Sequence, residues 1–383
     1  MQKMGVKEIA IISSVPLSEP VSRNRLVPFC NLFIEKGLSV SLICPKSDPN
    51  SHAHPAGVNL IEVSIESDKP KSFFKRAIKE ASDAATLLKV AKAQKADAYL
   101  PSMPSMFLAF LPPFYLPKKC SFIDIRDLTW EYLSDKSFLQ RLSKNAFRFL
   151  FKRTINFYQL VAVTNSVEFA YVNAVRKGVK PTLLVSNGIT KEQFDKLQTT
   201  LPANNDKLTV TYIGNVGIAQ NLETLVGAAK QLPEVQFRII GAGIELDKVS
   251  YMVRESKLSN VELTGRIPWD SVKDYYNSTD VLYAQLTSDF AGAMPSKLYE
   301  YLSTGKYIIY GGEGQAAEKL GEFNNNQVIP PNDANALVEA IKAVKECGEI
   351  NKLSKQNRQQ IEEHYIRENT ARKLIDGVID TIN

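Results

Sequence analysis

The chain has 383 residues, 44% of them hydrophobic and 23% charged, which is the composition of an ordinary globular protein. Its four cysteines and three histidines show no metal-ligand spacing, and no apolar run reaches the roughly 18 residues of a membrane-spanning helix. The charge is asymmetric, because residues 1–190 carry 26 Lys and Arg against 15 Asp and Glu, whereas residues 191–383 carry 21 against 26. We expect an intracellular protein without a signal peptide, long enough for two domains.

Both halves of the sequence alternate short apolar strands with helices. In the first half, strands are predicted at residues 8–12, 39–45, 98–100, 121–125, 160–163 and 182–185. A helix is expected from about Asn24 to Lys36. In the second half, strands are predicted at 207–213, 235–240, 261–264, 280–285 and 307–310, with helices such as 222–231 and 270–277 between them. This alternation predicts an α/β protein with parallel sheets in two doubly wound domains.

The domain boundary is expected after Asn187 and Gly188, because the polar stretch 191–207 has the composition of a linker. The predicted domains are therefore residues 1–190 and 191–364. The charged tail from about residue 356 to 383 is predicted to be helical. Its apolar positions are Ile361, Tyr365, Leu374, Ile375, Val378 and Ile379.

The segment 295–301 is the most informative in the chain. Pro295 suits the first turn of a helix, and Leu298 begins an apolar face at helical spacing. Helix N-termini attract anions, and here Ser296 and Lys297 add a hydroxyl and a cation. Glu300 lies one turn further on the same face as Ser296, where it could accept hydrogen bonds from sugar hydroxyls. This pattern predicts a nucleotide-diphosphate site, although an ordinary surface helix after a loop would look the same.

Glycine turns follow three of the predicted strands in the second half. They lie at 214–217, 241–243 and 265–266. Ligands of doubly wound folds bind at the carboxyl ends of the strands, and glycine lets the backbone approach a phosphate closely. Each turn is weak evidence alone, but three turns together with the helix after Pro295 favour a nucleotide site.

These segments resemble those of the GT-B-fold, retaining glycosyltransferases of family 4. The resemblance is closest to the bacterial branch that builds O-antigen or capsule repeat units and transfers N-acetylated amino sugars. It extends over most of the chain, at residues 125–128, 185–189, 212–220, 240–243, 263–268 and 295–302. The combination is specific for the fold and the reaction class, but it does not identify the sugar.

The resemblance implies a GT-B fold, in which two Rossmann-like doubly wound domains face a cleft. Residues 1–190 would form the acceptor domain, with the last helix, 365–383, packing back on it, and residues 191–364 would bind the nucleotide-sugar. It further implies metal-independent transfer of a sugar from a UDP-sugar to a lipid-diphosphate-linked saccharide, at the cytoplasmic face of the plasma membrane. No cofactor besides the UDP-sugar donor, and no nucleic acid, is expected.

The resemblance also assigns residues to parts of the donor. Glu300 would bind the ribose, and the helix after Pro295 would bind the diphosphate. Arg266 and Ile267, after Gly265, match the loop beside the base, while Gly214 and Gly217 match the loop under the phosphates and the transferred sugar. The other expected donor contacts are Asn187, Asn215, Gln220, Gly241, Gly243, Ser296 and Leu298.

Four positions depart from the family pattern. Asn215 and Gln220 stand where many members have an Arg and a Lys that neutralise the diphosphate, and Gly292 stands where many have a second glutamate. Arg126 lies near the place of a histidine in the first domain. Charge neutralisation is then expected from Lys297, the helix N-terminus and Arg126, and the usual contact to the donor-sugar hydroxyls is in doubt.

The mechanism is limited by which groups are absent from the sequence. There is no Asp-x-Asp, so a metal-bound diphosphate is not expected. Lys297 and the helix dipole could stabilise the leaving group without a metal. Asp127 and Glu131 are the carboxylates expected to orient the acceptor hydroxyl, unless they pair with Arg126 or Arg153.

Two other functions remain open from the sequence. A GT-B-fold UDP-sugar epimerase would need a histidine at the anomeric carbon, and His52, His54 and His364 do not suit that position. A catalytically weakened nucleotide-sugar-binding protein is suggested by the departures at Asn215, Gln220 and Gly292.

Residues 136–153 hold six basic residues and no acid. On a helix, Arg141, Lys144, Arg148 and Lys152 would form one stripe with Phe147 and Phe151 beside it. The opposite, core-facing stripe would be Phe138, Leu139, Leu142, Ala146, Phe149 and Leu150. We expect the basic stripe to contact an anionic membrane surface, with residues 71–79 as a second candidate and a solvated basic face as the alternative.

Overall fold

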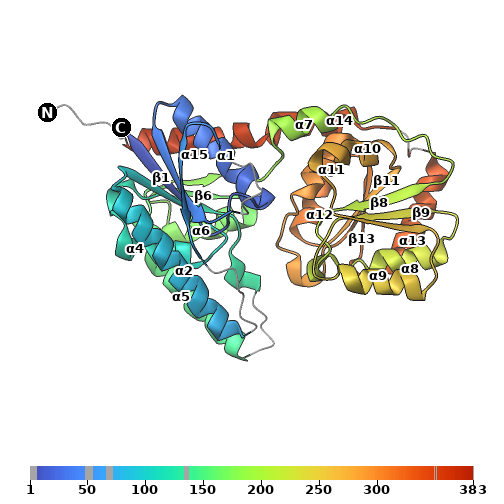
Figure 1. Ribbon diagram of the computed structural model, residues 1–383, viewed down its shortest axis with the longest axis horizontal. Coiled ribbons are helices and arrows are strands. Elements are labelled where there is room, and N and C mark those ends of the chain that lie inside the picture. Colours follow the sequence, from blue (N-terminus) through green and yellow to red (C-terminus); the bar gives the residue numbers. More distant parts are fainter. Residues whose placement is uncertain are drawn as a thin grey trace. The chain divides into compact units, whose positions relative to one another are not determined.

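The computed structural model describes residues 7–47, 55–65, 72–132, 138–348, 350 and 352–382. The chain divides into two compact units, one of Met1–Asn187 with Arg367–Asn383 and one of Gly188–Ile366 (Figure 1). Each unit contains one parallel sheet with helices packed on it, so the predicted α/β class is confirmed. The chain passes from the first unit to the second between residues 187 and 188, and it returns between residues 366 and 367. The sequence predicted these boundaries at 190/191 and 364/365, a few residues away.

The first unit holds a seven-stranded sheet with the strand order β3-β2-β1-β4-β5-β6-β7. Its strands are β1 (Glu8–Ser13), β2 (Ser39–Pro45), β3 (Val58–Val63), β4 (Ala98–Ser102), β5 (Ile123–Ile125), β6 (Val161–Val163) and β7 (Thr182–Leu184). Its helices are α1 (Pro20–Glu35), α2 (Phe73–Gln94), α3 (Phe107–Phe110), α4 (Pro112–Tyr115), α5 (Phe138–Thr154), α6 (Ser166–Arg176) and α15 (Arg367–Ile382). The sequence did not predict β3, which is an edge strand with mostly half-buried or exposed residues and therefore a weak apolar signal.

The central strands of this sheet are buried on both faces. In β1, Ile9 and Ile11 pack in one core cluster with residues of α1 and α15, whereas Ala10 and Ile12 pack in another with Leu87 of α2. This is why the strand is a continuous apolar run rather than an alternating one. The helical tail predicted from residue 356 is in fact two helices, α14 (Lys355–His364) and α15, and α15 packs on α1.

Helix α5 corrects the predicted orientation of the basic segment. Phe151 is fully buried, Lys144 is buried, and Phe147 stacks on Phe110 with ring centroids 5.9 Å apart. Arg148 forms an ion pair with Glu131. The predicted stripe of four outward-facing cations with Phe147 and Phe151 beside it is therefore wrong, because half of its members face the interior.

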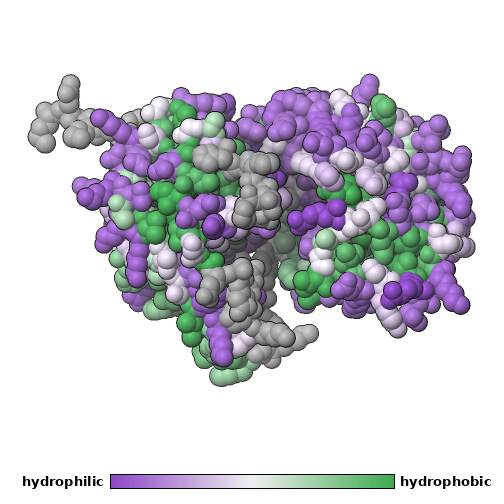
Figure 2. Space-filling model, viewed as in Figure 1, coloured by the Kyte–Doolittle hydropathy of each residue, from purple (hydrophilic) through white to green (hydrophobic). Residues whose placement is uncertain are grey.

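The stripe that was predicted to be the core is the exposed one. Its large side chains are all exposed: Phe138, Leu139, Leu142, Phe149 and Leu150. Figure 2 shows hydrophobic residues at the lower tip of the first unit, where Figure 1 draws the beginning of α5. The helix has two apolar stripes, and its period alone does not say which one meets the core. Of the second candidate segment, Phe74 is exposed, and Lys71 lies outside the described residues.

The second unit holds a six-stranded sheet with the order β10-β9-β8-β11-β12-β13. Its strands are β8 (Thr209–Ile213), β9 (Gln236–Ile240), β10 (Val261–Gly265), β11 (Val281–Gln285), β12 (Tyr307–Gly311) and β13 (Asn326–Ile329). Its other helices are α7 (Lys191–Leu197), α8 (Glu223–Gln231), α9 (Leu246–Glu255), α10 (Val272–Asn277), α11 (Lys297–Thr304), α12 (Gln315–Leu320) and α13 (Ala334–Cys347).

The stretch predicted to be a linker begins with a helix. Thr190 caps α7, its side chain accepting a hydrogen bond from the backbone of Gln193, and Gln193 completes a capping box. Phe194 and Leu197 of α7 are buried in the same core cluster as α11. The polar composition of the stretch therefore reflects the exposed face of a short capped helix, followed by a loop up to β8.

Candidate functional site

The candidate donor site lies at the switch point of the second sheet, between β8 and β11. The chain runs outward from β8 to β9 and β10, then returns to place β11 on the other side of β8. Ligands of doubly wound sheets bind at such a switch point, beyond the carboxyl ends of the strands. The glycine turn after β8 and the first residue of α11 meet at this point.

Tyr301 fixes α11 against the end of β8. Its hydroxyl accepts a hydrogen bond from the backbone N–H of Ile213 at 2.8 Å and lies 3.1 Å from the Ile213 carbonyl oxygen. Leu298 and Leu302 are fully buried on the same side of the helix. The helix begins at Lys297, so Pro295 and Ser296 precede it rather than forming its first turn.

Lys297 is the cation of the site. Its Nζ contacts the hydroxyl of Tyr212 and lies 3.9 Å from the centre of that ring. The Tyr212 hydroxyl in turn donates a hydrogen bond of 2.5 Å to the backbone oxygen of Asn215. Burial lowers the pKa of Lys297 to about 7, and the nearby charge of Glu300 only partly opposes this. Part of the Lys297 side chain is exposed. With a pKa of about 7, the Nζ is charged in only about half of the molecules at neutral pH.

Glu300 lies one turn along α11 from Lys297, on a half-buried position. The hydroxyl of Tyr276, on α10, is 3.5 Å from its Oε2. Burial, followed by the charge of Glu300, raises the pKa of Tyr276 well above its usual value, so this hydroxyl keeps its proton. The structure thus brings a carboxylate and a cation together as the sequence spacing suggested. Nothing in the sequence marks the three tyrosines near them, Tyr212, Tyr276 and Tyr301, because they look like any other buried aromatic residues.

The glycines after β8 and β9 are needed because the two turns are packed against each other. The N–H of Gly214 donates to the Ile240 oxygen at 2.8 Å, and a Cβ at Gly241 would collide with the Gly214 carbonyl. A Cβ at Gly243 would likewise collide with the Val216 carbonyl. Gly214 and Gly241 also have φ values of +151° and +148°, which side chains rarely adopt. The glycines were predicted to admit a phosphate, and the structure shows that they also let the turns stack.

The two amides that replace the family's basic pair contact each other. Asn215 Nδ2 donates to Gln220 Oε1 at 3.3 Å, beside Gly217. Arg266 is exposed after the left-handed Gly265, and Ile267 is half-buried against the core. Asn187 is the last residue of the first unit.

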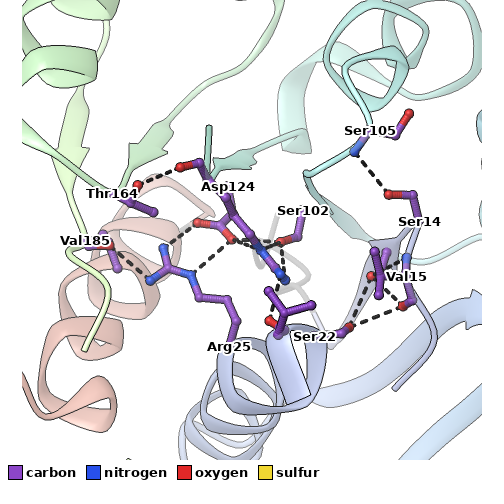
Figure 3. A network of polar contacts seen from close by, with 12 residues as sticks. Ser14, Val15, Ser22, Arg25, Ser102, Ser105, Asp124, Thr164 and Val185 are labelled. Carbon is purple, nitrogen blue, oxygen red and sulfur yellow. Dashed lines mark hydrogen bonds and ion pairs between the residues drawn. The ribbon is translucent and has the colours of Figure 1, made fainter. Parts of the chain in front are cut away.

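A buried polar network lies at the ends of β4 and β5 in the first unit (Figure 3). Asp124 accepts hydrogen bonds from Arg25 Nη2 at 2.6 Å and from Ser102 Oγ at 2.7 Å. Burial alone would raise the pKa of Asp124, but Arg25 and then Arg126 hold it below its usual value.

Arg126 belongs to this network and does not face a ligand. It is 4% exposed, its Nε and Nη2 donate to Ser102 Oγ, and its Nη1 donates to the Val21 oxygen. Burial lowers its pKa to about 10. The guanidinium that was expected to neutralise a diphosphate thus has its nitrogen atoms hydrogen-bonded inside the first unit.

Glu168 is a carboxylate that the sequence analysis missed. Its Oε1 accepts the N–H of Leu128 at 3.0 Å, and its neighbour Thr164 donates to the Arg126 oxygen at 2.7 Å. Glu168 thus holds the loop that carries Asp127, which is half-exposed. Burial and then the charge of Asp127 raise the pKa of Glu168 to about 8. In the sequence, Glu168 is indistinguishable from an ordinary first-turn acid after the helix cap Asn165.

Glu131, the other predicted acceptor carboxylate, is paired. Arg148 donates to its two oxygens at 2.8 and 2.5 Å. Its partner is thus Arg148 of α5, neither of the two arginines considered from the sequence. Among the described residues, no group of three His, Cys, Asp or Glu side chains could hold a metal ion, and no described helix is long and apolar enough to cross a membrane.

Comparisons with known proteins agree with this geometry. Residues 193–364, nearly all of the second unit, match the family model described as glycosyl transferases group 1. WcaI of Escherichia coli strain K12, whose description assigns it provisionally to colanic acid biosynthesis as a glycosyl transferase, is 24% identical over 198 residues. That alignment covers 50% of this chain and 47% of WcaI, so the chain matches about half the length of this relative.

Solved structures of similar fold extend over nearly the whole chain. Sucrose-phosphate synthase from Thermosynechococcus elongatus has a TM-score of 0.75 at 18% identity, covering 96% of this chain and 97% of its own. WaaG, a glycosyltransferase involved in lipopolysaccharide biosynthesis, has a TM-score of 0.70 at 14% identity, with coverages of 96% and 98%. Anabaena Alr3699/HepE, solved with UDP and glucose, has a TM-score of 0.67 at 13% identity, with coverages of 97% and 98%.

The two parallel-sheet units have the GT-B fold of solved glycosyltransferases such as WaaG. The second unit matches the model of the group 1 glycosyl transferases, and the resemblance stated from the sequence is confirmed at that level.

Proposed function

We propose that this protein is a retaining glycosyltransferase that uses a UDP-sugar, with an N-acetylated amino sugar as the transferred group. The acceptor is a lipid-diphosphate-linked saccharide of a surface polysaccharide, such as O-antigen or capsule, at the cytoplasmic face of the membrane. The observation that carries the proposal is the placement of Lys297 and Glu300 one turn apart on α11, at the switch point of the second sheet.

The diphosphate and the ribose of the donor would each meet a matching group in the second unit. The diphosphate would lie at the N-terminus of α11, against Lys297 and the backbone of the turn at Gly214. The ribose hydroxyls would donate to Glu300. UDP in the Anabaena neighbour, and the colanic acid and lipopolysaccharide roles in the names of WcaI and WaaG, support the donor and the pathway class.

Catalysis requires stabilising the charge that develops on the leaving diphosphate. Lys297 would do this when protonated, helped by the dipole of α11, whose N-terminus it occupies. No metal ion is part of this proposal. On the acceptor side, Asp127 is the carboxylate that would orient the hydroxyl, held in place by Glu168 and the Leu128 backbone. The leaving phosphate would help to take up the hydroxyl proton.

A catalytically weakened binding protein is the second candidate, and the contact between Asn215 and Gln220 favours it. These amides fill the places of the usual basic pair and satisfy each other, so they supply no positive charge. Such a protein would bind UDP tightly without transferring sugar.

A transfer assay separates these functions. The full chain is incubated with a panel of UDP-sugars, chosen by donor-dependent thermal shift, with and without a polyprenyl-diphosphate-linked saccharide. We expect UDP release and a longer lipid-linked product only when the acceptor is present, with the anomeric configuration of the donor retained. A changed UDP-sugar without acceptor would indicate an epimerase, and binding without any turnover would support the binding protein.

A further inference from the structure

The outer face of α5 is an exposed apolar surface on the first unit. Phe138 is 72% exposed, Leu142 56% and Phe149 57%, and Leu139 and Leu150 are also exposed. At about 100° per residue these five side chains fall within roughly a third of the helix circumference. Contiguous exposed apolar patches of this kind mark sites of contact with another protein or with a membrane.

The inner face of α5 prevents the helix from rotating to hide this surface. Phe151 lies against Trp130 with ring centroids 5.1 Å apart, and Phe147 stacks on Phe110. Arg148 is held by both oxygens of Glu131. Turning the outer residues inward would break this aromatic cluster and the ion pair, so the exposure of the outer face is built into the packing.

Cations lie on the exposed face among the apolar side chains. The guanidinium of Arg141 is 5.8 Å from the Phe138 ring centre, and that of Arg153 is 5.0 Å from the Phe149 ring centre. Lys152 is exposed as well, and the sequence of α5 contains no Asp or Glu. A surface that combines aromatic rings with cations and lacks acids is complementary to an anionic lipid surface, where rings enter the acyl boundary and cations remain at the headgroups.

Exposed apolar residues continue on the neighbouring elements. Phe74 and Ile78, in the first two turns of α2, are 53% and 69% exposed, and α2 and α5 both pack on α3. Here two cations are balanced, because Arg76 pairs with Glu80 and Lys79 with Asp83, while Lys75 is exposed as well. Most of the surplus positive charge is on α5, which makes α5 the centre of the surface.

We propose that the outer face of α5, defined by Phe138, Leu142 and Phe149 with Arg141 and Arg153, docks the protein on an anionic lipid bilayer. This inference deepens the proposed function, since it names the surface that would bring the enzyme to a lipid-linked acceptor. It replaces the predicted basic stripe, and its contacts are apolar insertion and headgroup attraction together.

Flotation of the full chain with vesicles tests the proposal. We expect binding to phosphatidylcholine vesicles that contain phosphatidylglycerol, and much weaker binding to phosphatidylcholine alone. The double variant Leu142→Gln/Phe149→Gln should lower the bound fraction on anionic vesicles at least tenfold. The matched control, Val179→Gln/Leu201→Gln, changes two apolar residues outside α5 that are more exposed than Leu142 and Phe149, and it should bind like the wild type.

A second pair of variants tests the cations. Arg141→Gln/Arg153→Gln should remove the preference for anionic over neutral vesicles and the sensitivity of binding to salt. The control Lys230→Gln/Lys345→Gln removes two exposed cations from the second unit and should keep both properties. Circular dichroism and UDP binding of each variant verify that it is folded.

Three results would overturn the proposal. The first is a wild type that does not float with anionic vesicles, and the second is unchanged binding by the Leu142→Gln/Phe149→Gln variant. The third is a wild-type dimer in analytical ultracentrifugation that this variant converts to a monomer without affecting flotation, which would make the face a contact between copies. Vesicle binding without sugar transfer would contradict the proposed function and leave the docking surface in place.

Discussion

The pKa of Lys297 predicts that donor binding depends on pH. In the free protein, burial holds this pKa at about 7, so the lysine loses its charge as the pH rises through neutrality. A bound diphosphate favours the charged form and raises the pKa in the complex. Binding above pH 7 must therefore take up a proton, and donor affinity should fall with increasing pH until the pKa of the complex is reached.

The size of this effect follows from the population of the charged form. At pH 8 about one molecule in ten has a protonated Lys297, which raises the apparent Kd about tenfold relative to pH 6. This corresponds to about 1.4 kcal/mol of binding free energy for each pH unit above 7. Tyr212, the contact of Lys297, keeps its proton throughout, because burial raises its pKa well above the usual value.

Isothermal titration calorimetry with a UDP-sugar between pH 6 and 9 measures this dependence. A UDP-sugar is preferable to UDP because its diphosphate has no proton to lose in this range. Runs in two buffers of different ionisation enthalpy count the protons taken up, and we expect close to one at pH 8. The variant Lys297→Gln should bind more weakly at pH 6 and show no dependence on pH.

A second lysine with a lowered pKa shows whether the pH dependence belongs to Lys297. Burial lowers the pKa of Lys306, beyond the other end of α11, to about 8, and the Lys297→Gln variant retains it. A wild-type Kd that is constant from pH 6 to 9, or a slope that persists in Lys297→Gln, would refute the assignment of Lys297 as the cation for the diphosphate.

Three further predictions concern the two units separately. Glu300→Gln should weaken UDP binding by about 1–3 kcal/mol, as expected for a lost charged hydrogen bond, whereas the exposed Glu318→Gln should not; equal calorimetric affinities for wild type and Glu300→Gln would exclude the ribose contact. Because burial raises the pKa of Glu168 in the folded protein from its usual 4.5 to about 8, thermal stability should decline as the pH rises between those values, by up to about 1.4 kcal/mol per pH unit. Glu168→Gln should flatten this decline in a calorimetric melting series, and an unchanged slope would argue against a protonated Glu168. Transfer activity should persist in excess EDTA, and a loss that magnesium or manganese restores would contradict metal-independent catalysis.

The sequence determined the fold class and most of the strand positions, because buried parallel strands are continuous apolar runs that end in recognisable turns. β8, for example, was expected at 207–213 and lies at Thr209–Ile213. The proximity of Lys297 and Glu300 could also be predicted from the sequence, because residues three positions apart on a helix are neighbours on its surface. β3 escaped prediction because an edge strand has no such apolar run.

Relations between distant segments were decided only by the tertiary structure. Arg126 follows β5 in a motif that matched the family. Its side chain is nevertheless buried, where it donates hydrogen bonds to Ser102 Oγ and to the Val21 carbonyl. Tyr212, which sets the environment of Lys297, is 85 residues away in sequence. Helix α5 shows the physical reason most clearly. Its periodicity defines two apolar stripes, and the choice between them depends on whether Phe110 and Trp130, from other elements, pack against Phe151 and Phe147 or leave them in water.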